Sequence, residues 1–140
     1  MGDEMINKQK GFTLIELLVT VLIVGILGTI AYSTYSKSVL KGNRSDAKTS
    51  LMQVMQTEER YFSEQNTYTT NLTTLGFSTN PLTTSNGYYQ VTATASASGL
   101  TSGITLTAAP VGNQTKDVCG SYILNSLGQK STSSNVSGCW

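Results

Sequence analysis

Hydrophobic residues are unevenly distributed along this chain, and they form one long apolar run near its N-terminus. The segment from Phe12 to Ala31 carries a single charge in 20 residues. At about 1.5 Å of rise per residue, a helix of this length matches the roughly 30 Å hydrocarbon core of a bilayer. The run is longer than the apolar core of a secretory signal peptide, and no A-x-A-like cleavage site follows it. We therefore predict a retained helix that crosses a membrane.

The pattern beyond Ala31 predicts that this helix continues to about Glu64. The stretch contains no proline, and apolar residues recur at steps of three or four or their sums. These residues are Tyr32, Tyr35, Val39, Ala47, Leu51, Val54, Met55 and Phe62. A continuous helix over 12–64 would be roughly 80 Å long, which a domain of this size cannot bury. We therefore expect a segment at 12–35 that projects into a membrane or other subunits, and an amphipathic segment at 36–64 that packs on a globular head.

The remainder, 65–140, has the pattern of a small antiparallel sheet. The stretch 65–87 reads as a surface connection with one short helical turn. Strands are predicted at Tyr88–Ser96, Gly103–Ala109, Ser121–Ser126 and Gln129–Thr132, with a hairpin turn at Gly99–Gly103. Alternation places two sets of side chains inward: Tyr89, Val91, Ala93 and Ala95, and then Ile104, Leu106 and Ala108. The predicted fold class is α+β, with the sheet laid on the helix.

Composition and charge exclude several classes of function. The net charge is +1 and there is no histidine, so bulk electrostatic binding of nucleic acid and histidine-based chemistry are not expected. The two cysteines cannot form a four-thiolate zinc site, and no G-x-S-x-G, P-loop or C-x-x-C motif occurs. From Gln65 onward the only charges are Lys116, Asp117 and Lys130, too few for a calcium site or a strong DNA footprint. No catalytic residue, cofactor or metal is predicted.

Glu16 is the one charge inside the apolar run. A carboxylate near the middle of a span costs about 2.5–3.5 kcal/mol on insertion scales. It could reach the membrane interface from the helix end, because it lies only about 6 Å along the axis from Phe12. Alternatively, it could wait in the membrane for a positively charged partner. The residues alone favour neither interpretation.

The octapeptide from Lys10 to Leu17, KGFTLIEL, resembles the processing site of type IV prepilins. The resemblance implies that a prepilin peptidase removes the leader 1–11 by cleaving after Gly11 on the cytoplasmic side. It further implies that the new amine of Phe12 is methylated and that Glu16 pairs with the Phe12 amine of a neighbouring subunit. This provides Glu16 with the partner that the second interpretation requires.

Two features depart from what such a span and such a family usually show. Basic residues flanking the span number two before it (Lys8, Lys10) and four after it (Lys37, Lys41, Arg44, Lys48), which by the positive-inside rule would put the C-terminal side in the cytoplasm. The prepilin signature is more specific, so we expect the head in the periplasm. Ser33 also stands where many pilins have a helix-distorting proline, which predicts a straighter helix here.

An exported head favours a disulfide between Cys119 and Cys139, the only two cysteines. In the chain-entropy model, closing this loop stabilises the fold by roughly 3 kcal/mol. The segment Cys119–Leu124, then Gly128, then Cys139-Trp140 is similar to the C-terminal region of short PilE-like minor pilins. That resemblance implies a type IV pilin fold with a disulfide-bounded loop at its end.

Together the resemblances imply a structural subunit of a type IV pilus rather than an enzyme. A minor pilin that supports pilus assembly, twitching motility, adhesion or DNA uptake is favoured. Its expected partners are other pilin subunits, the prepilin peptidase and the inner-membrane assembly machinery. The expected location is the inner membrane before assembly and the extracellular pilus afterwards. The alternatives are a pseudopilin of a type II secretion system and a membrane-anchored pilin that binds DNA.

Overall fold

The computed structural model describes residues 11–134 and 136–140. It contains one long helix, α1 (Leu14–Gln65), two short 3-10 helices, η1 (Leu72–Leu75) and η2 (Gly112–Lys116), and five strands. The chain divides into two compact units between Ser36 and Lys37, and α1 contributes residues to both. We call the second unit, Lys37–Trp140, the head. The predicted leader 1–11 lies outside the described residues except for Gly11, as do Lys8 and Lys10.

Helix α1 begins two residues later and ends one residue later than the sequence predicts. It is continuous through Ser33, whose hydroxyl donates a hydrogen bond to the carbonyl of Ile30 (3.0 Å). At its C-terminus Asn66 adopts a left-handed conformation (φ 56°), and its N–H donates to the carbonyl of Phe62 (2.8 Å). Asparagine tolerates this conformation better than most residues, so it ends the helix at Gln65.

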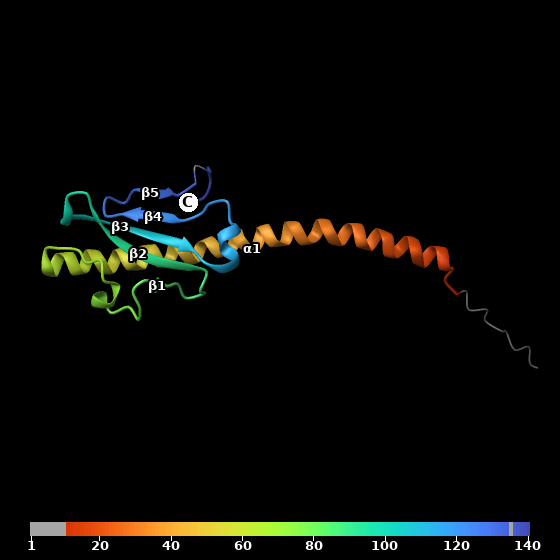
Figure 1. Ribbon diagram of the computed structural model, residues 1–140, viewed down its shortest axis with the longest axis horizontal. Coiled ribbons are helices and arrows are strands. Elements are labelled where there is room, and N and C mark those ends of the chain that lie inside the picture. The colour runs from red at the N-terminus through yellow and green to blue at the C-terminus, as the bar shows by residue number, and fades with distance from the viewer. Residues whose placement is uncertain (1–10, 135) are drawn as a thin grey trace, which may run out of the picture. The chain divides into compact units, whose positions relative to one another are not determined.

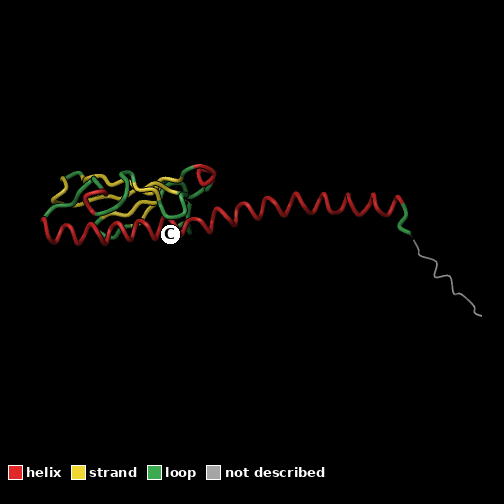
Figure 2. The backbone as a smooth tube through the Cα atoms, turned by 90° about the horizontal axis from the view of Figure 1, so that it is seen from below, coloured by secondary structure: helices red, strands yellow, loops and turns green. Residues whose placement is uncertain are grey.

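The head consists of a five-stranded antiparallel sheet packed on the C-terminal part of α1 (Figures 1 and 2). The strands follow one another in space in chain order. They are β1 (Leu82–Thr83), β2 (Tyr89–Ser96), β3 (Gly99–Pro110), β4 (Tyr122–Asn125) and β5 (Lys130–Thr132). Such a meander needs only short connections between neighbouring strands, which suits a chain with many glycine and asparagine turns. The predicted α+β class is confirmed.

The core of the head lies between α1 and one face of the sheet. Its buried members include Ala47, Leu51 and Val54 on the helix, and Tyr89, Val91, Ile104, Leu106 and Ala108 on the sheet. These agree with the predicted apolar faces, except that Val39 on the helix and Ala95 on the sheet are exposed. Ala95 lies at the point where the register between β2 and β3 shifts, so the alternation of inward and outward side chains is lost there. Burying each large side chain stabilises the fold by about 1.5–3 kcal/mol.

The hairpin between β2 and β3 turns earlier than predicted. The turn lies at 97–98, and 99–103 instead begins β3, where an irregular register pairs Ser96 with Gly99 but Ala95 with Ile104. A Cβ at Gly103 would lie 2.9 Å from the Ser126 hydroxyl oxygen, so a larger residue there would require the Ser126 side chain to shift. The sequence prediction also missed the short strand β1 and the helix η2, whereas η1 is the expected helical turn in 65–87.

Candidate functional site

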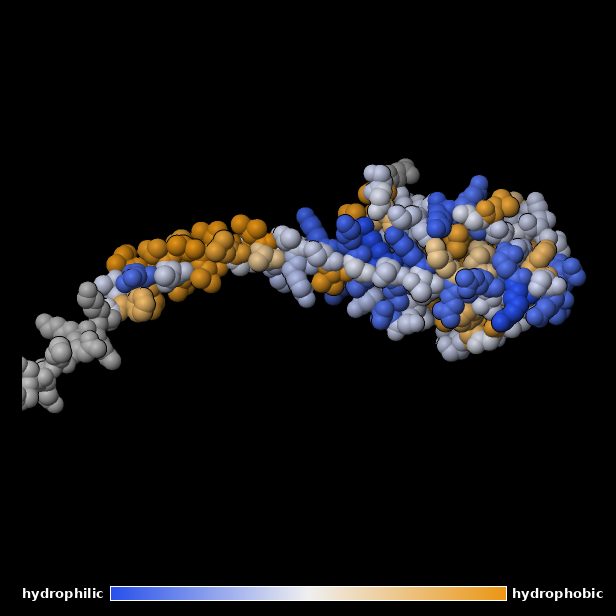
Figure 3. Space-filling model, turned by 180° about the vertical axis from the view of Figure 1, so that it is seen from behind, coloured by the Kyte–Doolittle hydropathy of each residue, from blue (hydrophilic) through white to orange (hydrophobic). Residues whose placement is uncertain are grey.

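The apolar N-terminal part of α1 exposes its hydrophobic side chains all around the helix. It contains an 18-residue window of mean hydropathy 2.5, and none of that window is buried. Figure 3 shows hydrophobic side chains gathered on this part of the helix. The segment is long and apolar enough to cross a membrane. Because an apolar patch of this size is unusual on a soluble surface, it needs lipid or other protein helices to cover it.

Glu16 folds back over the first turn of its own helix. Its Oε2 lies 3.5 Å from both the backbone nitrogen and the hydroxyl oxygen of Thr13, and the Glu16 N–H donates to the Thr13 hydroxyl (3.3 Å). Thr13 and Glu16 therefore form a capping box, in which two helix-terminal N–H groups find side-chain acceptors. The T-x-x-E spacing that is typical of such a box is visible in the sequence at Thr13–Glu16.

Gly11 and Phe12 precede the first turn and are exposed, with 84% of Phe12 accessible to solvent. No cation lies at the Glu16 carboxylate among the described residues. Their one ion pair is in the head, between Arg44 and Asp117. The predicted cleavage, methylation and intersubunit pairing all involve other molecules, so they stay predictions.

A buried polar cluster joins η2 and the adjacent Asp117 to α1. The Arg44 guanidinium donates two hydrogen bonds to Asp117 (Nε–Oδ2 2.8 Å, Nη2–Oδ1 2.7 Å). Gln114 is buried beside them, where its Oε1 accepts a hydrogen bond from Asn43 and its Nε2 lies 2.9 Å from the Leu40 carbonyl oxygen. Although burial opposes its ionised form, hydrogen bonds from Arg44 and from the Cys119 N–H lower the pKa of Asp117.

Cys119 and Cys139 form the predicted disulfide, and both are buried. The Tyr122 hydroxyl donates to the carbonyl of Cys139 (3.1 Å), and the Trp140 ring meets the Tyr122 ring edge-on with centroids 5.4 Å apart. These contacts attach the C-terminal loop to the sheet. The prediction that the fold ends in a disulfide-bounded loop is therefore confirmed.

Two lysines lie over the aromatic residues at this edge. The Nζ of Lys130 lies 5.1 Å from the centroid of the Trp140 ring, and that of Lys48 lies 5.9 Å from the same ring. Both distances suit cation–π attraction. Lys116, the other basic residue after Gln65, is instead at the end of η2.

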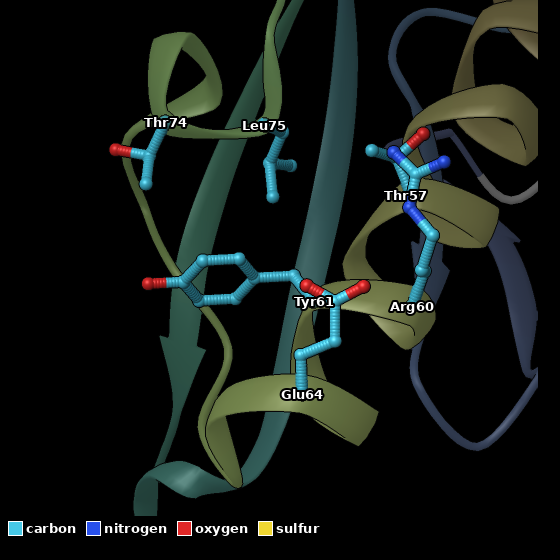
Figure 4. A pocket seen from close by; sticks show the side chains of 6 residues that line it. All are labelled: Thr57, Arg60, Tyr61, Glu64, Thr74 and Leu75. Atoms are coloured by element: carbon cyan, nitrogen blue, oxygen red, sulfur yellow. The ribbon is translucent and has the colours of Figure 1, made fainter.

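An open hollow of about 110 Å³ lies between the last turns of α1 and η1 (Figure 4). The Tyr61 ring extends across it toward Thr74, while Arg60 and Glu64 stand at its border. The lining is mostly polar. In the described part of the chain, no three His, Cys, Asp or Glu side chains gather closely enough to hold a metal ion.

Two family models match consecutive parts of the chain. Residues 6–32 match the prokaryotic N-terminal methylation motif, and residues 33–123 match the family described as the type IV minor pilin ComP, DNA uptake sequence receptor. The second match covers well over half of the chain. The boundary between the two matches falls near the end of the apolar segment.

Individual relatives agree with these matches. The chain is 37% identical over 70 residues to the type IV major pilin protein PilA of Myxococcus xanthus, covering 50% of this chain and 32% of that protein. It is 32% identical over 104 residues to the fimbrial protein EcpC of Eikenella corrodens, covering 74% of this chain and 65% of that one. The chain thus spans between about a third and two thirds of these relatives.

A solved structure supports the same grouping. A type IV pilin from Shewanella oneidensis superposes with a TM-score of 0.53 at 27% identity, covering 72% of this chain and 97% of that one.

Proposed function

The chain belongs to the type IV minor pilin family, and from this premise we propose that it is a structural subunit of a bacterial type IV pilus. The observation that carries the proposal is the exposed apolar part of α1, which directly follows a G-F-T-L-I-E motif and continues into a folded head. A filament of packed helices would cover that apolar surface, as lipid does before assembly. The role is structural and needs no catalytic residue, cofactor or metal.

Processing would convert Glu16 from a local cap into an intersubunit contact. Before cleavage the nitrogen of Phe12 is an uncharged amide, whereas cleavage after Gly11 by a prepilin peptidase would make it a cationic amine, which is then methylated. The present contacts of Glu16 with Thr13, at 3.3–3.5 Å, are longer than good hydrogen bonds of 2.7–3.2 Å. Exchanging them for a charge-assisted bond to a neighbouring Phe12 would be favourable inside an apolar filament core.

The proposed organisation follows the same logic. The leader 1–11 is removed, 12–35 anchors the subunit in the inner membrane and later lies in the filament core, and 36–64 with 65–140 form the head. The disulfide supports a periplasmic and then extracellular head, since such bonds persist in oxidising compartments. Other pilin subunits and the inner-membrane assembly machinery are the proposed partners.

Filament incorporation of Glu16 variants tests the proposal. We expect Glu16→Ala to lower the amount of this protein in sheared, purified pili by at least about tenfold, the effect of losing an interaction worth about 1.4 kcal/mol, while its membrane level stays unchanged. Glu64→Ala, which removes an exposed acid from the same helix, is the matched control. Normal incorporation of Glu16→Ala would contradict the proposed role of the carboxylate. A mature chain that begins elsewhere than Phe12 would contradict the assignment itself.

DNA binding is a second candidate function, because the matching family is described as a DNA uptake sequence receptor. On this chain the proposed contact is the edge where Lys48 and Lys130 lie over the Trp140 ring. Such contacts to phosphates would make the affinity fall steeply with salt. We expect Lys48→Ala/Lys130→Ala to weaken DNA binding and Lys116→Ala to leave it nearly unchanged. Equal losses in both variants would exclude this edge as the contact.

A type II secretion pseudopilin is less well supported than a pilus subunit. The head has a disulfide, and its described residues contain no acidic cluster for a calcium ion. Deleting the gene should therefore reduce surface pili and leave type II secretion intact.

A further inference from the structure

Glu58 is a buried acidic residue of the head, and one of its carboxyl oxygens lacks a hydrogen-bond partner. It lies on the face of α1 that packs on the core and has 0% of its surface exposed. Its Oε1 is the one buried side-chain polar atom without a hydrogen-bond partner in 11–134 and 136–140. By contrast, the buried carboxylates of Asp46 and Asp117 accept hydrogen bonds at both oxygens. A buried polar atom without a partner is rare and calls for a physical explanation.

The other oxygen of Glu58 holds the segment that follows α1. The Thr69 N–H donates to Glu58 Oε2 (3.2 Å), and the Tyr68 hydroxyl donates to Glu59 Oε1 (2.9 Å). The Tyr68 ring stacks on Phe62 with centroids 4.5 Å apart, and its N–H donates to the carbonyl of Leu100 (3.1 Å). We call residues 66–69 the docking segment. It is held by hydrogen bonds to the Glu58 and Glu59 carboxylates and to β3, and by the stacking of Tyr68 on Phe62.

Within 11–134 and 136–140, no cation pairs with Glu58 or contributes to its electrostatics. On α1 the adjacent Glu59 is the charged group that acts on it, and the docking segment contributes Tyr68. On the sheet, β2 and β3 carry Tyr89 as their one titratable residue, and Tyr89 bonds to Gln114 instead. Burial raises the pKa of Glu58 to about 7, with a further upward contribution from Glu59 and an opposing one from the Thr69 N–H.

We propose that Glu58 is a proton-controlled latch, which keeps the docking segment on α1 when its carboxyl is neutral and releases it when the carboxyl ionises. A neutral carboxyl loses little by burial, and its carbonyl oxygen still accepts the Thr69 N–H. An ionised carboxylate must either remain buried with one oxygen unsolvated or admit water. The docking segment contacts Glu58 directly and has few buried side chains of its own, so opening it is the least costly route for water.

Release would alter the surface beyond the segment itself. The docking segment leads within a few residues into η1, and Thr74 and Leu75 of η1 form one side of the hollow whose other side is the Tyr61 face of α1 (Figure 4). A proton taken up or released at Glu58 would thereby change the shape of this exposed surface. The latch would respond near neutral pH, where both forms of the carboxyl are populated.

Amide hydrogen exchange of the full chain in detergent micelles tests the latch. After correction for the intrinsic pH dependence of exchange, we expect protection of the Tyr68 and Thr69 amides to fall by at least about tenfold between pH 5.5 and 8, by proton linkage. Glu58→Gln, which mimics the neutral carboxyl, should keep high protection throughout. Glu59→Gln is the matched control: it should retain the pH dependence with its midpoint moved to lower pH, because the neighbouring negative charge is gone.

A measurement on the unaltered protein keeps the test independent of whether the variants fold. The side-chain carboxyl carbon of Glu58, followed by NMR, should titrate near neutral pH. A midpoint near the ordinary value for glutamate would overturn the proposal. Protection of Thr69 that does not change with pH, or that changes equally in Glu58→Gln, would overturn it as well. None of these results depends on incorporation into pili.

Discussion

The Arg44 guanidinium and the Asp117 carboxylate form a two-pronged ion pair that joins α1 to the segment following β3. The Asp117 side chain is 1% exposed and that of Arg44 is 16% exposed. Removing one partner of such a pair leaves the other charge buried, which costs more than the pair itself contributes.

We expect Arg44→Ala to lower the free energy of unfolding of the head by about 3 kcal/mol, because Asp117 would remain buried without its cation. Chemical denaturation in micelles, followed by the Trp140 fluorescence, would measure this loss. Lys116→Ala removes a neighbouring exposed charge and should change the stability by less than about 0.5 kcal/mol. If both variants have similar stability, the ion pair does not hold η2 to the helix.

The stability of the head should be greatest in weakly acidic solution. The lowered pKa of Asp117 gives stability that is present above its unfolded pKa of about 3.8 and is lost as the pH falls through its lower folded value. The raised pKa of Glu58 gives stability that is fully present below about 4.5 and is lost as the pH rises to about 7. Thermal unfolding over pH 3–8 should therefore show a maximum between these two ranges.

The loss of stability above about pH 5 should be caused by the ionisation of Glu58. In Glu58→Gln the decline between pH 5 and 7 should disappear, because Glu58 is the one described acid whose pKa is raised into this range, while the acid decline caused by Asp117 should persist. A decline of wild-type size in this variant would assign it to another group.

Reduction of the disulfide should lower the free energy of unfolding by about 3 kcal/mol, as expected for a loop of about 20 residues. The C-terminal loop also loses its attachment when the thiols separate, so the Tyr122–Cys139 hydrogen bond and the stacking of Trp140 should weaken with it. Denaturation of Cys119→Ser/Cys139→Ser with and without reductant checks this prediction. Reductant should lower the stability of the wild type and leave that of the variant unchanged.

Local sequence determined the elements that depend on neighbouring residues. The apolar run and the three-to-four spacing that follows it specify α1 within two residues at each end, because helical hydrogen bonds are local and every turn repeats the same pattern. Alternation in 88–96 likewise located β2, because side chains of a strand point to opposite faces in turn. The position of the hairpin turn was wrong, since a register shift depends on how two strands fit together.

Tertiary structure alone decided which charges are buried and what they contact. Arg44 and Asp117 are 73 positions apart, and nothing in either neighbourhood specifies the other. Glu58 continues the helix face of Ala47, Leu51 and Val54, so its spacing already placed it toward the core, but its lack of a partner follows only from the segment folded over it. Periodicity is a property of one element, whereas the electrostatic state of a buried carboxylate depends on every group that packs around it.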